Sequence, residues 1–280
     1  MKKLPLTFVI PIKIDTDDRQ RNFDIVVGYL LKNYDCPIII KEADWEKRLK
    51  SQHLDDPRVK YMFEHLEFGD PFHRTKYINE MVNECETECF ANYDVDVIFN
   101  PSTIEESVKL IMDGKADVVY PFGDGEMDQC RLWISSKESI ISLIDTFDGE
   151  NLLRDIAQKT VDDGGKMEAW TTLAGHCQIF RKKSFLEGYM ENENFVSWGP
   201  EDAERLSRFR KLGFRVQHLS GEKLIHLEHE SSVDSGKENP YFRLNETLFK
   251  HLTSLSDDEF KKYYEEVSYT EKYTSRNGDK

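Results

Sequence analysis

The protein has 280 residues, of which 39% are hydrophobic and 32% are charged, and its formal net charge is −15. This length fits one large domain, or one domain with an extension, and the apolar content is sufficient for a hydrophobic core. The negative charge excludes a general nucleic-acid binder, because that role needs a basic face that displaces counterions.

No segment of the sequence is typical of a membrane span or an export signal. No apolar run approaches the roughly 20 residues that a helix needs to cross a bilayer. The first apolar run is short and interrupted by Pro5 and Pro11, whereas a signal peptide needs a longer apolar core and a small-residue cleavage site. The five cysteines predict the thiols of a reduced protein rather than a metal site. We therefore expect a cytoplasmic protein without a transmembrane segment; peripheral association with a membrane stays open.

Strands and helices alternate in the first half of the chain. Residues 6–12 form a continuous apolar run, typical of a strand that is covered on both faces. A strand, a helix and a strand at this spacing build a parallel sheet. In chain order we expect strand 6–12, helix 22–34, strand 36–44, helix 74–88, strand 89–99, helix 101–114 and strand 116–122.

The second half mixes short strands and glycine-containing loops with helices. Strands are predicted over 176–180 and 214–219, and a helix over 201–214. Two further helices, over 241–252 and 257–267, precede a polar tail that we expect to fray. The sequence thus predicts one α/β domain over residues 1–238 and a helical C-terminal extension over residues 239–280.

The segment ANYDVDVIFN places two carboxylates within the predicted strand 89–99. In a strand, Asp94 and Asp96 would share one face, and burying both is costly unless something compensates their charge. A cation such as Mn²⁺ or Mg²⁺ at the carboxyl end of the strand would do so, since carboxylate oxygens suit such ions. The alternative is a solvated turn with acids at its tip.

The segment SWGPEDAERL predicts a loop through Trp198 and Gly199 and a helix that begins near Pro200. Glu201 and Asp202 then lie in the first helical turn, where carboxylates are favoured and stay ionised. Ordinary helix capping is one explanation. The other is that Asp202, held rigidly at the wall of a crevice, accepts a proton from an incoming hydroxyl.

Two further segments carry candidate binding residues. LIHLEHE places His226 and His229 after an apolar run, where they are either structural or ligands of a transition metal such as Mn²⁺. PFHRTKYIN places Arg74 and Lys76 at the start of a predicted helix. Arginine can pair with phosphate oxygens in a fork geometry, and the alternative is a solvated basic turn.

In this order, the motifs resemble those of the GT-A glycosyltransferases, especially the inverting β-1,4-galactosyltransferase group and its bacterial chondroitin-polymerase-like relatives. The first strand ends in Ile-Pro, and Phe-x-Arg-x-Lys-x-x-Asn follows at 72–79. Asp-Val-Asp at 94–96, Trp-Gly-x-Glu-Asp at 198–202 and a late histidine complete a pattern that spans Phe8 to His229. The resemblance implies a Rossmann-like GT-A fold, with a mostly parallel central sheet flanked by helices.

The resemblance also implies roles for individual residues. Asp94 and Asp96 contact ribose and metal, with Asp96 the more direct ligand, and His226, in preference to His229, completes the metal site. Asp202 is the catalytic base, and Glu201 contacts the donor or acceptor sugar. The nucleotide-sugar donor is bound by Pro11, Phe72, Arg74, Lys76, Asp94, Gly175 and Trp198.

The sequence departs from this group after the first strand. Lys13 and Asp15 stand where arginines are usual, so Arg19 or Arg21 is expected to take over their contacts to the nucleotide. Pro200 replaces a common glycine, and Ala203 replaces an acid. The identities of donor and acceptor therefore do not carry over from the group.

We expect a metal-dependent inverting glycosyltransferase that uses Mn²⁺ or Mg²⁺. The donor is a UDP-sugar of the galactose, N-acetylgalactosamine, glucose or N-acetylglucosamine type, and the acceptor is a hydroxyl of a glycan or glycolipid. By analogy, the reaction serves polysaccharide assembly. Two other functions stay open: a metal-dependent sugar-nucleotide hydrolase and a non-catalytic module that binds glycan or nucleotide.

Overall fold

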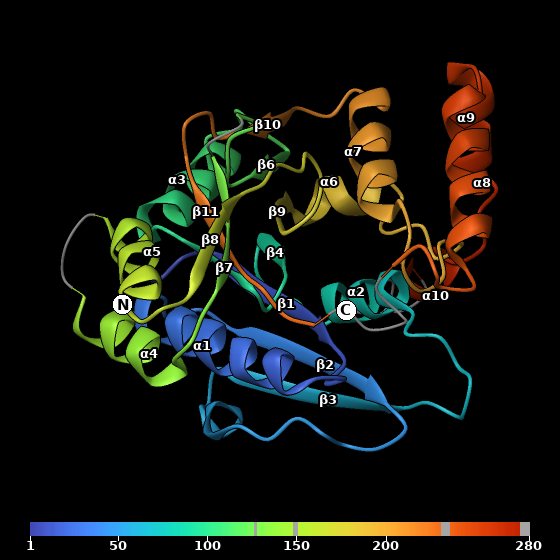
Figure 1. The fold of residues 1–280 in the computed structure, drawn as a ribbon. Coiled ribbons are helices and arrows are strands. Elements are labelled where there is room, and N and C mark those ends of the chain that lie inside the picture. The colour runs from blue at the N-terminus through green and yellow to red at the C-terminus, as the bar shows by residue number, and fades with distance from the viewer. Residues whose placement is uncertain (126–127, 148–150, 231–235, 275–280) are drawn as a thin grey trace.

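A seven-stranded sheet forms the centre of the computed structural model, which describes residues 1–125, 128–147, 151–230 and 236–274 (Figure 1). Its order is β10 (Val216–His218), β6 (Val118–Tyr120), β9 (Cys177–Arg181), β4 (Cys89–Tyr93), β1 (Leu6–Ile12), β2 (Ile38–Asp44) and β3 (Val59–His65). Neighbouring strands are parallel except that β9 is antiparallel to β4 and β6. The expectation of a mostly parallel central sheet is confirmed.

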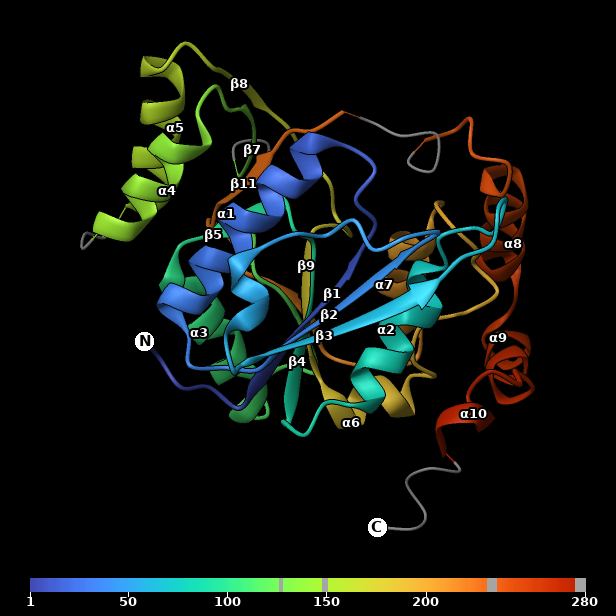
Figure 2. The ribbon, with the colours of Figure 1, turned by 90° about the horizontal axis from the view of Figure 1, so that it is seen from below.

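Helices cover both faces of this sheet (Figure 2). On one face lie α1 (Asp17–Asn33) and α3 (Pro101–Met112); on the other lie α2 (Arg74–Asn83), α6 (Lys182–Glu187) and α7 (Glu201–Lys211). Phe8, Val9 and Ile10 of β1 are therefore completely buried, as are Phe90 and Ala91 of β4. This two-sided burial explains why the central strands are continuously apolar.

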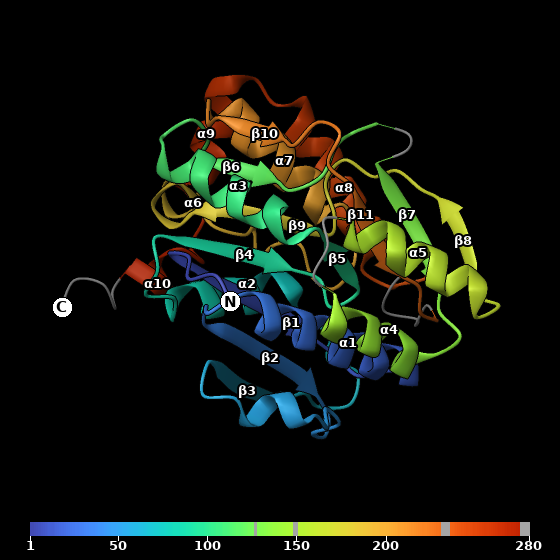
Figure 3. The same ribbon diagram turned by 90° about the vertical axis from the view of Figure 1, so that its left-hand side faces the viewer.

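A second, four-stranded sheet lies beside the first. Its order is β5 (Val97–Phe99), β11 (Leu224–Leu227), β7 (Gln129–Trp133) and β8 (Lys166–Ala169). The helix α5 (Leu152–Asp162) packs against this sheet, and α4 (Lys137–Thr146) packs against α5 and α1 (Figure 3). A short turn joins β4 to β5, so the two sheets meet at residues 94–96.

The structure corrects one predicted element. Residues 89–99 do not form a single strand, because β5 leaves the central sheet and pairs antiparallel with β11. Asp94, Val95 and Asp96 form the intervening turn, so the two carboxylates do not share a strand face. The predicted strand over 6–12 and helix over 101–114 are confirmed.

Several elements were not predicted at all. They are β3, β7, β8, α4, α5, α6, α10 (Glu271–Thr274) and a short 3₁₀ helix, Gln52–Asp55. The edge strand β3 is only partly buried along its length, so it lacks the continuous apolar run that identifies β1. The strands β7 and β8 belong to the smaller sheet, and residues 166–169 of β8 are exposed.

The C-terminal helices α8 (Phe242–Ser254), α9 (Asp257–Glu265) and α10 (Glu271–Thr274) lie on the α7 side of the molecule (Figure 2). A buried apolar cluster joins α8 and α9 to the loop before α7; its members are Phe195, Leu252, Phe260 and Tyr264. The division of the chain at residue 238 remains a prediction, and residues 275–280 of the predicted polar tail lie outside the described residues. No helix in the described ranges is both long and apolar enough to cross a membrane.

Candidate active site

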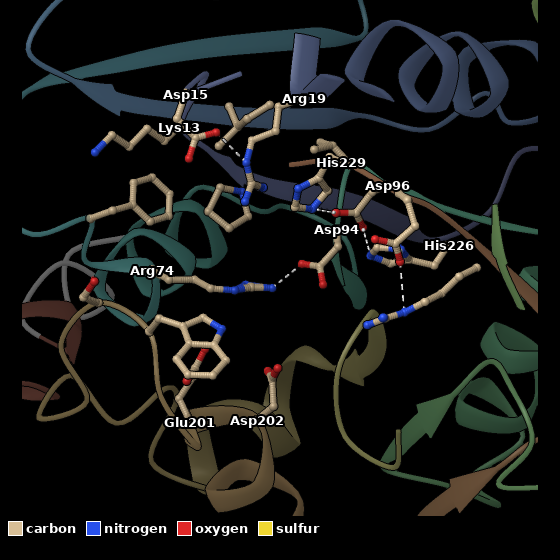
Figure 4. Close-up of a pocket in the computed structure, with 18 of the residues that line it drawn as sticks. Lys13, Asp15, Arg19, Arg74, Asp94, Asp96, Glu201, Asp202, His226 and His229 are labelled. Carbon is tan, nitrogen blue, oxygen red and sulfur yellow. Dashed lines mark hydrogen bonds and ion pairs between the residues drawn. The ribbon is translucent and has the colours of Figure 1, made fainter. Parts of the chain in front are cut away.

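A cavity of about 360 Å³ opens at the carboxyl ends of β1 and β4. This is the edge at which open α/β sheets bind ligands. Figure 4 shows charged side chains converging on it from opposite sides. The cavity is lined by Pro11, Ile12, Lys13, Asp15, Arg19, Phe72, Arg74, Asp94, Val95, Asp96, Arg131, Trp170, Ser197, Trp198, Glu201, Asp202, His226, Glu228 and His229.

The turn between β4 and β5 carries Asp94 and Asp96 into the cavity. The backbone N–H of Asp94 donates to the carbonyl of His176 at 3.0 Å, and the carbonyl of Asp96 accepts from the N–H of Leu227 at 2.7 Å. The turn is therefore tied to the segment that leads into β9 and to β11. It directs the two carboxylates differently: Asp94 points toward Arg74, and Asp96 points toward the histidines (Figure 4).

Asp96, His226 and His229 form a compact group of metal-ligating side chains. One ligand atom from each lies within 4.8 Å of the others. Nε2 of His226 lies 3.6 Å from Oδ1 of Asp96, and Nε2 of His229 lies 3.2 Å from Oδ2. Burial raises the pKa of Asp96, but the two histidines outweigh it and hold this pKa below the ordinary range. Conversely, burial lowers the pKa of His229 and Asp96 raises it, with a net increase.

These residues fit a divalent transition metal. Oδ1 of Asp96 is buried without a hydrogen-bond partner within the part of the chain that the structure describes. A carboxylate with two imidazoles suits Mn²⁺ better than Mg²⁺, which prefers oxygen ligands. Nδ1 of His226 lies 3.1 Å from Oε1 of Glu228, and such a carboxylate orients a metal-binding imidazole. Both histidines, and not His226 alone, are therefore placed beside Asp96.

Asp94 pairs with Arg74 and lies outside the group of three. Oδ1 of Asp94 accepts from Nη2 of Arg74 at 2.5 Å. Burial raises the pKa of Asp94 to about 6, with Arg74 opposing the shift and Asp96 adding to it. Nη1 of Arg74 is buried and, among the described residues, has no hydrogen-bond partner. The pair thus offers a carboxylate and an N–H donor to a ligand in the cavity.

Glu201 and Asp202 form the opposite wall, at the start of α7 (Figure 4). Glu201 is only 4% exposed, and its Oε2 accepts from the N–H of Gly199 at 3.0 Å. Burial raises the pKa of Glu201 to about 8, and Asp202 raises it further while Arg74 opposes the shift. The Asp202 side chain is 30% exposed, and its Oδ1 accepts from Nη1 of Arg205 at 2.7 Å. One oxygen of Asp202 is thus anchored inside the protein while the side chain reaches the cavity.

The loop before α7 is held by the C-terminal helix α8. Asn245 accepts from the N–H of Val196 at 3.3 Å and donates to the carbonyls of Val196 and Trp198 at 2.7 and 3.1 Å. The indole of Trp198 stacks on Phe242 with ring centroids 5.4 Å apart. A Cβ atom on Gly199 would lie 2.6 Å from Cβ of Asn245. Only glycine allows this close approach of loop and helix.

The loop after β1 contributes Lys13 and Asp15 to the cavity, and the first turn of α1 contributes Arg19. Nε of Arg19 lies 2.7 Å from Oδ1 of Asp15. Arg21 is not among the lining residues, because its guanidinium donates to the carbonyl of Glu228 at 2.6 Å. Of the two arginines expected to take over nucleotide contacts, Arg19 is therefore the one that reaches the cavity.

Two of the predicted donor-binding residues do not line the cavity. Nζ of Lys76, on α2, donates to Oε1 of Glu64 at 2.7 Å, and neither residue lines the cavity. Gly175 lies close to Asp202, since a Cβ atom at this position would be 3.6 Å from Oδ2 of Asp202. The five remaining predicted residues do line it: Pro11, Phe72, Arg74, Asp94 and Trp198.

Sequence reasoning missed several residues that surround the histidines. The guanidinium of Arg131 lies 3.6 Å from the ring centroid of Trp170, and its Nε is 2.9 Å from Oε1 of Glu228. His176, which adopts a left-handed backbone with φ 69°, has its ring 5.5 Å from that of His226. Burial lowers the pKa of His176 to about 3. Of these residues, only Glu228 could have been recognised from the sequence, because it lies between the two candidate histidines.

Comparison with known proteins finds likeness only at the level of structure. No known protein family and no curated protein matches the sequence. The catalytic domain of Drosophila β1,4-galactosyltransferase 7, solved with xylobiose, is similar at 12% identity and a TM-score of 0.45, over 82% of this chain and 72% of that one. GalNAc-T7, solved with UDP, GalNAc and Mn²⁺, is similar at 11% identity and a TM-score of 0.55, over 92% of this chain and 50% of that one.

The chain thus spans half the length of the GalNAc-T7 chain. At sequence identities this low, similarity between structures establishes a shared fold but not a shared activity or substrate. Together with the strand order and the helices on both faces, the likeness to GalNAc-T7 shows that the chain has the GT-A fold of glycosyltransferase catalytic domains.

Proposed function

We propose that this protein is a metal-dependent glycosyltransferase that uses a UDP-sugar donor. The observation that carries the proposal is the composition of one cavity. Asp96, His226 and His229 lie on one side, the Arg74–Asp94 pair lies beside them, and Asp202 faces them from α7. GalNAc-T7, which shares the fold, was solved with UDP, GalNAc and Mn²⁺, and this supports the choice of donor and metal.

Asp96, His226 and His229 would hold Mn²⁺, or less favourably Mg²⁺. When bound, the ion supplies positive charge that stabilises the departing nucleoside diphosphate. Arg74 would also bind the nucleoside diphosphate part of the donor, because its buried Nη1 can donate a hydrogen bond to a phosphate or ribose oxygen. Pro11, Phe72 and Arg19 line the adjoining wall, where they would contact the nucleotide.

Asp202 acts as the general base in this proposal. Its carboxylate takes the proton of the acceptor hydroxyl as the oxygen attacks the anomeric carbon from the face opposite the diphosphate. A single displacement inverts the configuration at this carbon and needs only one base. Glu201, whose raised pKa of about 8 keeps it protonated at neutral pH, would donate a hydrogen bond to a sugar hydroxyl. Trp198 would bound the sugar on the same wall.

The acceptor is proposed to be a hydroxyl of a glycan or glycolipid. This choice rests on analogy with the fold. It is supported by the wall that α7 and the preceding loop form, which offers Trp198 and the carboxyl groups of Glu201 and Asp202 to a ligand.

A thermal-shift panel tests the proposal directly. The protein is treated with chelator and then melted with UDP, with Mn²⁺ and with both. We expect stabilisation by UDP that depends on Mn²⁺, because a ligand that binds only the folded state raises its stability. UDP-galactose, UDP-GalNAc, UDP-glucose and UDP-GlcNAc are then offered with glycan acceptors, and UDP release and the anomeric configuration of the product are measured.

Three outcomes contradict parts of the proposal. Donor cleavage at the same rate with and without acceptor indicates a sugar-nucleotide hydrolase. UDP binding that ignores Mn²⁺, with no turnover of any donor, indicates a non-catalytic binding module. Retained anomeric configuration in the product excludes the single displacement by which Asp202 acts as base.

A further inference from the structure

Arg205 lies beneath the cavity at the centre of a buried hydrogen-bond network. Its side chain is completely buried on α7. Nε donates to Oε1 of Glu191 at 2.5 Å, and Nη1 donates to Oδ1 of Asp202 at 2.7 Å and to Oε1 of Gln178 at 2.9 Å. One guanidinium therefore contacts two carboxylates and an amide at once.

The network continues from Gln178 to the other end of the cavity. Oε1 of Gln178 also accepts from Nδ2 of Asn92 at 2.7 Å, and Oδ1 of Asn92 accepts from Nη2 of Arg74 at 3.4 Å. Nη2 of Arg74 is the same atom that donates to Asp94. Asn92 and Gln178 are both completely buried. A continuous chain of polar contacts thus runs from Asp94 to Asp202 through side chains of α2, β4, β9 and α7.

The charge of Arg205 is balanced without Asp202. Burying a guanidinium is costly unless a carboxylate pairs with it, and Glu191, itself only 1% exposed, supplies that pairing. The hydrogen bond from Arg205 to Asp202 is therefore not needed to balance the charge of Arg205. Instead, it fixes the orientation of the Asp202 carboxylate, which lines the cavity. Arginine can make all three contacts because its N–H groups form a rigid planar fork, whereas the single ammonium of lysine cannot.

We propose that Arg205 is the positioning residue of Asp202. It holds the carboxylate at a set distance and direction from the Arg74–Asp94 pair, through Gln178 and Asn92. Because Asp202 is the base only under the proposed function, this role rests on that function. Arg205 does not line the cavity, so it acts on the reaction only through Asp202.

The same helix contains a matched control. Arg208 is also completely buried and lies one turn further along α7. Its Nε donates to Oε1 of Glu204 at 2.9 Å, and its Nη1 donates to the carbonyl of Gly188. Glu204 in turn accepts from the hydroxyl of Tyr264 on α9. Arg208 therefore has the burial and a carboxylate partner like Arg205, but its hydrogen-bond partners among the described residues lie outside the cavity lining.

The test compares Arg205→Lys with Arg208→Lys in the full-length protein. For each variant we measure the melting temperature, the Kd of UDP with Mn²⁺, and kcat and KM for the best donor found in the panel. Both substitutions should lower the melting temperature. Arg205→Lys should lower kcat about tenfold to a hundredfold, since a small misplacement of a catalytic group has effects of this size, with the Kd of UDP and the KM of the donor unchanged. Arg208→Lys should keep the wild-type kcat.

Equal kcat values for the two variants would overturn the proposal, as would a parallel loss of UDP affinity and kcat in Arg205→Lys. If the wild-type protein transfers no sugar, the proposed function fails and the positioning role is tested by crystallography instead. A structure of Arg205→Lys in which the Asp202 carboxylate keeps its wild-type orientation overturns it; a rotated or disordered carboxylate supports it.

Discussion

The two walls of the cavity are held by different kinds of contact. On the sheet wall, backbone hydrogen bonds fix the turn that bears Asp94 and Asp96, and strand pairing of β5 with β11 brings His226 beside it. On the helix wall, contacts of side chains fix the positions of the lining residues. Asn245 and Phe242 of α8 hold the loop at Trp198, and Arg205 holds Asp202. The sheet wall is thus part of the central architecture, whereas the helix wall depends on packing by the C-terminal helices.

This difference has a physical consequence. A ladder of backbone bonds survives most single side-chain substitutions, so changes on the sheet wall should act only through the ligand atoms they remove. A wall held by side chains can be displaced by substitutions that never touch the ligand. The predictions below use this contrast, beginning with the largest effect.

The sheet wall should lose its function when its ligand atoms are removed. Asp96→Ala is expected to abolish Mn²⁺-dependent binding of UDP, because Asp96 lies between both histidines. Glu228→Gln, which weakens the support of His226 and removes the ion pair with Arg131, should reduce Mn²⁺ affinity by about tenfold to a hundredfold. Titration calorimetry of Mn²⁺ and of UDP measures both effects. Wild-type UDP binding by Asp96→Ala at every Mn²⁺ concentration would show that the cation lies elsewhere.

The helix wall should separate binding from turnover. Asp202→Asn removes the proposed base but keeps the shape of the side chain, so UDP binding should be unchanged while kcat falls about a hundredfold or more. Calorimetry with UDP and Mn²⁺ is compared with the rate of UDP release in the presence of acceptor. A wild-type kcat in this variant would mean that another group takes the proton.

Loosening the helix wall from behind should affect both stability and turnover. Asn245→Ala removes three hydrogen bonds to the loop at residues 196–198; because buried partners are left unsatisfied, we expect a loss of about 1 to 3 kcal/mol in the free energy of unfolding. A lower kcat should accompany it, since Trp198 and Glu201 follow the loop. Thr247→Ala, an exposed substitution on the same helix, is the control and should change neither. Denaturant unfolding and kcat measurement distinguish the two variants.

The last effect changes only the pH dependence of stability, and it concerns the buried carboxyl group of Glu201 on the helix wall. The pKa of Glu201 is raised to about 8, so between about pH 4.5 and 8 the folded protein binds this proton while the unfolded chain releases it. Glu201 therefore makes the free energy of unfolding fall as the pH rises through this range. Glu201→Gln removes this contribution, so the variant should gain about 1.4 kcal/mol in the free energy of unfolding relative to wild type for each pH unit between pH 5 and 8. Denaturant unfolding of the variant and the wild type at pH 5 and at pH 8 checks this prediction. If the two proteins differ in their free energy of unfolding by the same amount at both pH values, Glu201 is ionised throughout.

The sequence predicted most strands of the central sheet, but not the point at which the chain leaves this sheet for the second one. A continuous apolar run identified β1 at residues 6–12 and a capped amphipathic pattern identified α3, because these signals depend on neighbouring residues only. The run 89–99 looked like one strand for the same reason: nothing local marks the point at which β5 leaves β4 to pair with a strand more than a hundred residues away.

The candidate site shows the same limit. The motifs at 72–79, 94–96, 198–202 and 226–229 were recognised as local patterns, and most of their residues line one cavity. Arg131 and Trp170 carried no such pattern, because only the pairing of β7 with β11 and β8 brings them beside His226. Arg205 looked like one of several charges on an amphipathic helix, yet it is completely buried.

By itself, the sequence determined the alternation of strands and helices and the types of ligand atom available for a cation and a nucleotide, since periodicity and residue chemistry are local properties. Only the tertiary structure decided that Asp96 joins both histidines while Asp94 joins Arg74, and that Arg205 supports Asp202 from below. These choices depend on the direction of each side chain where two sheets and α7 meet, and contacts between distant segments set those directions.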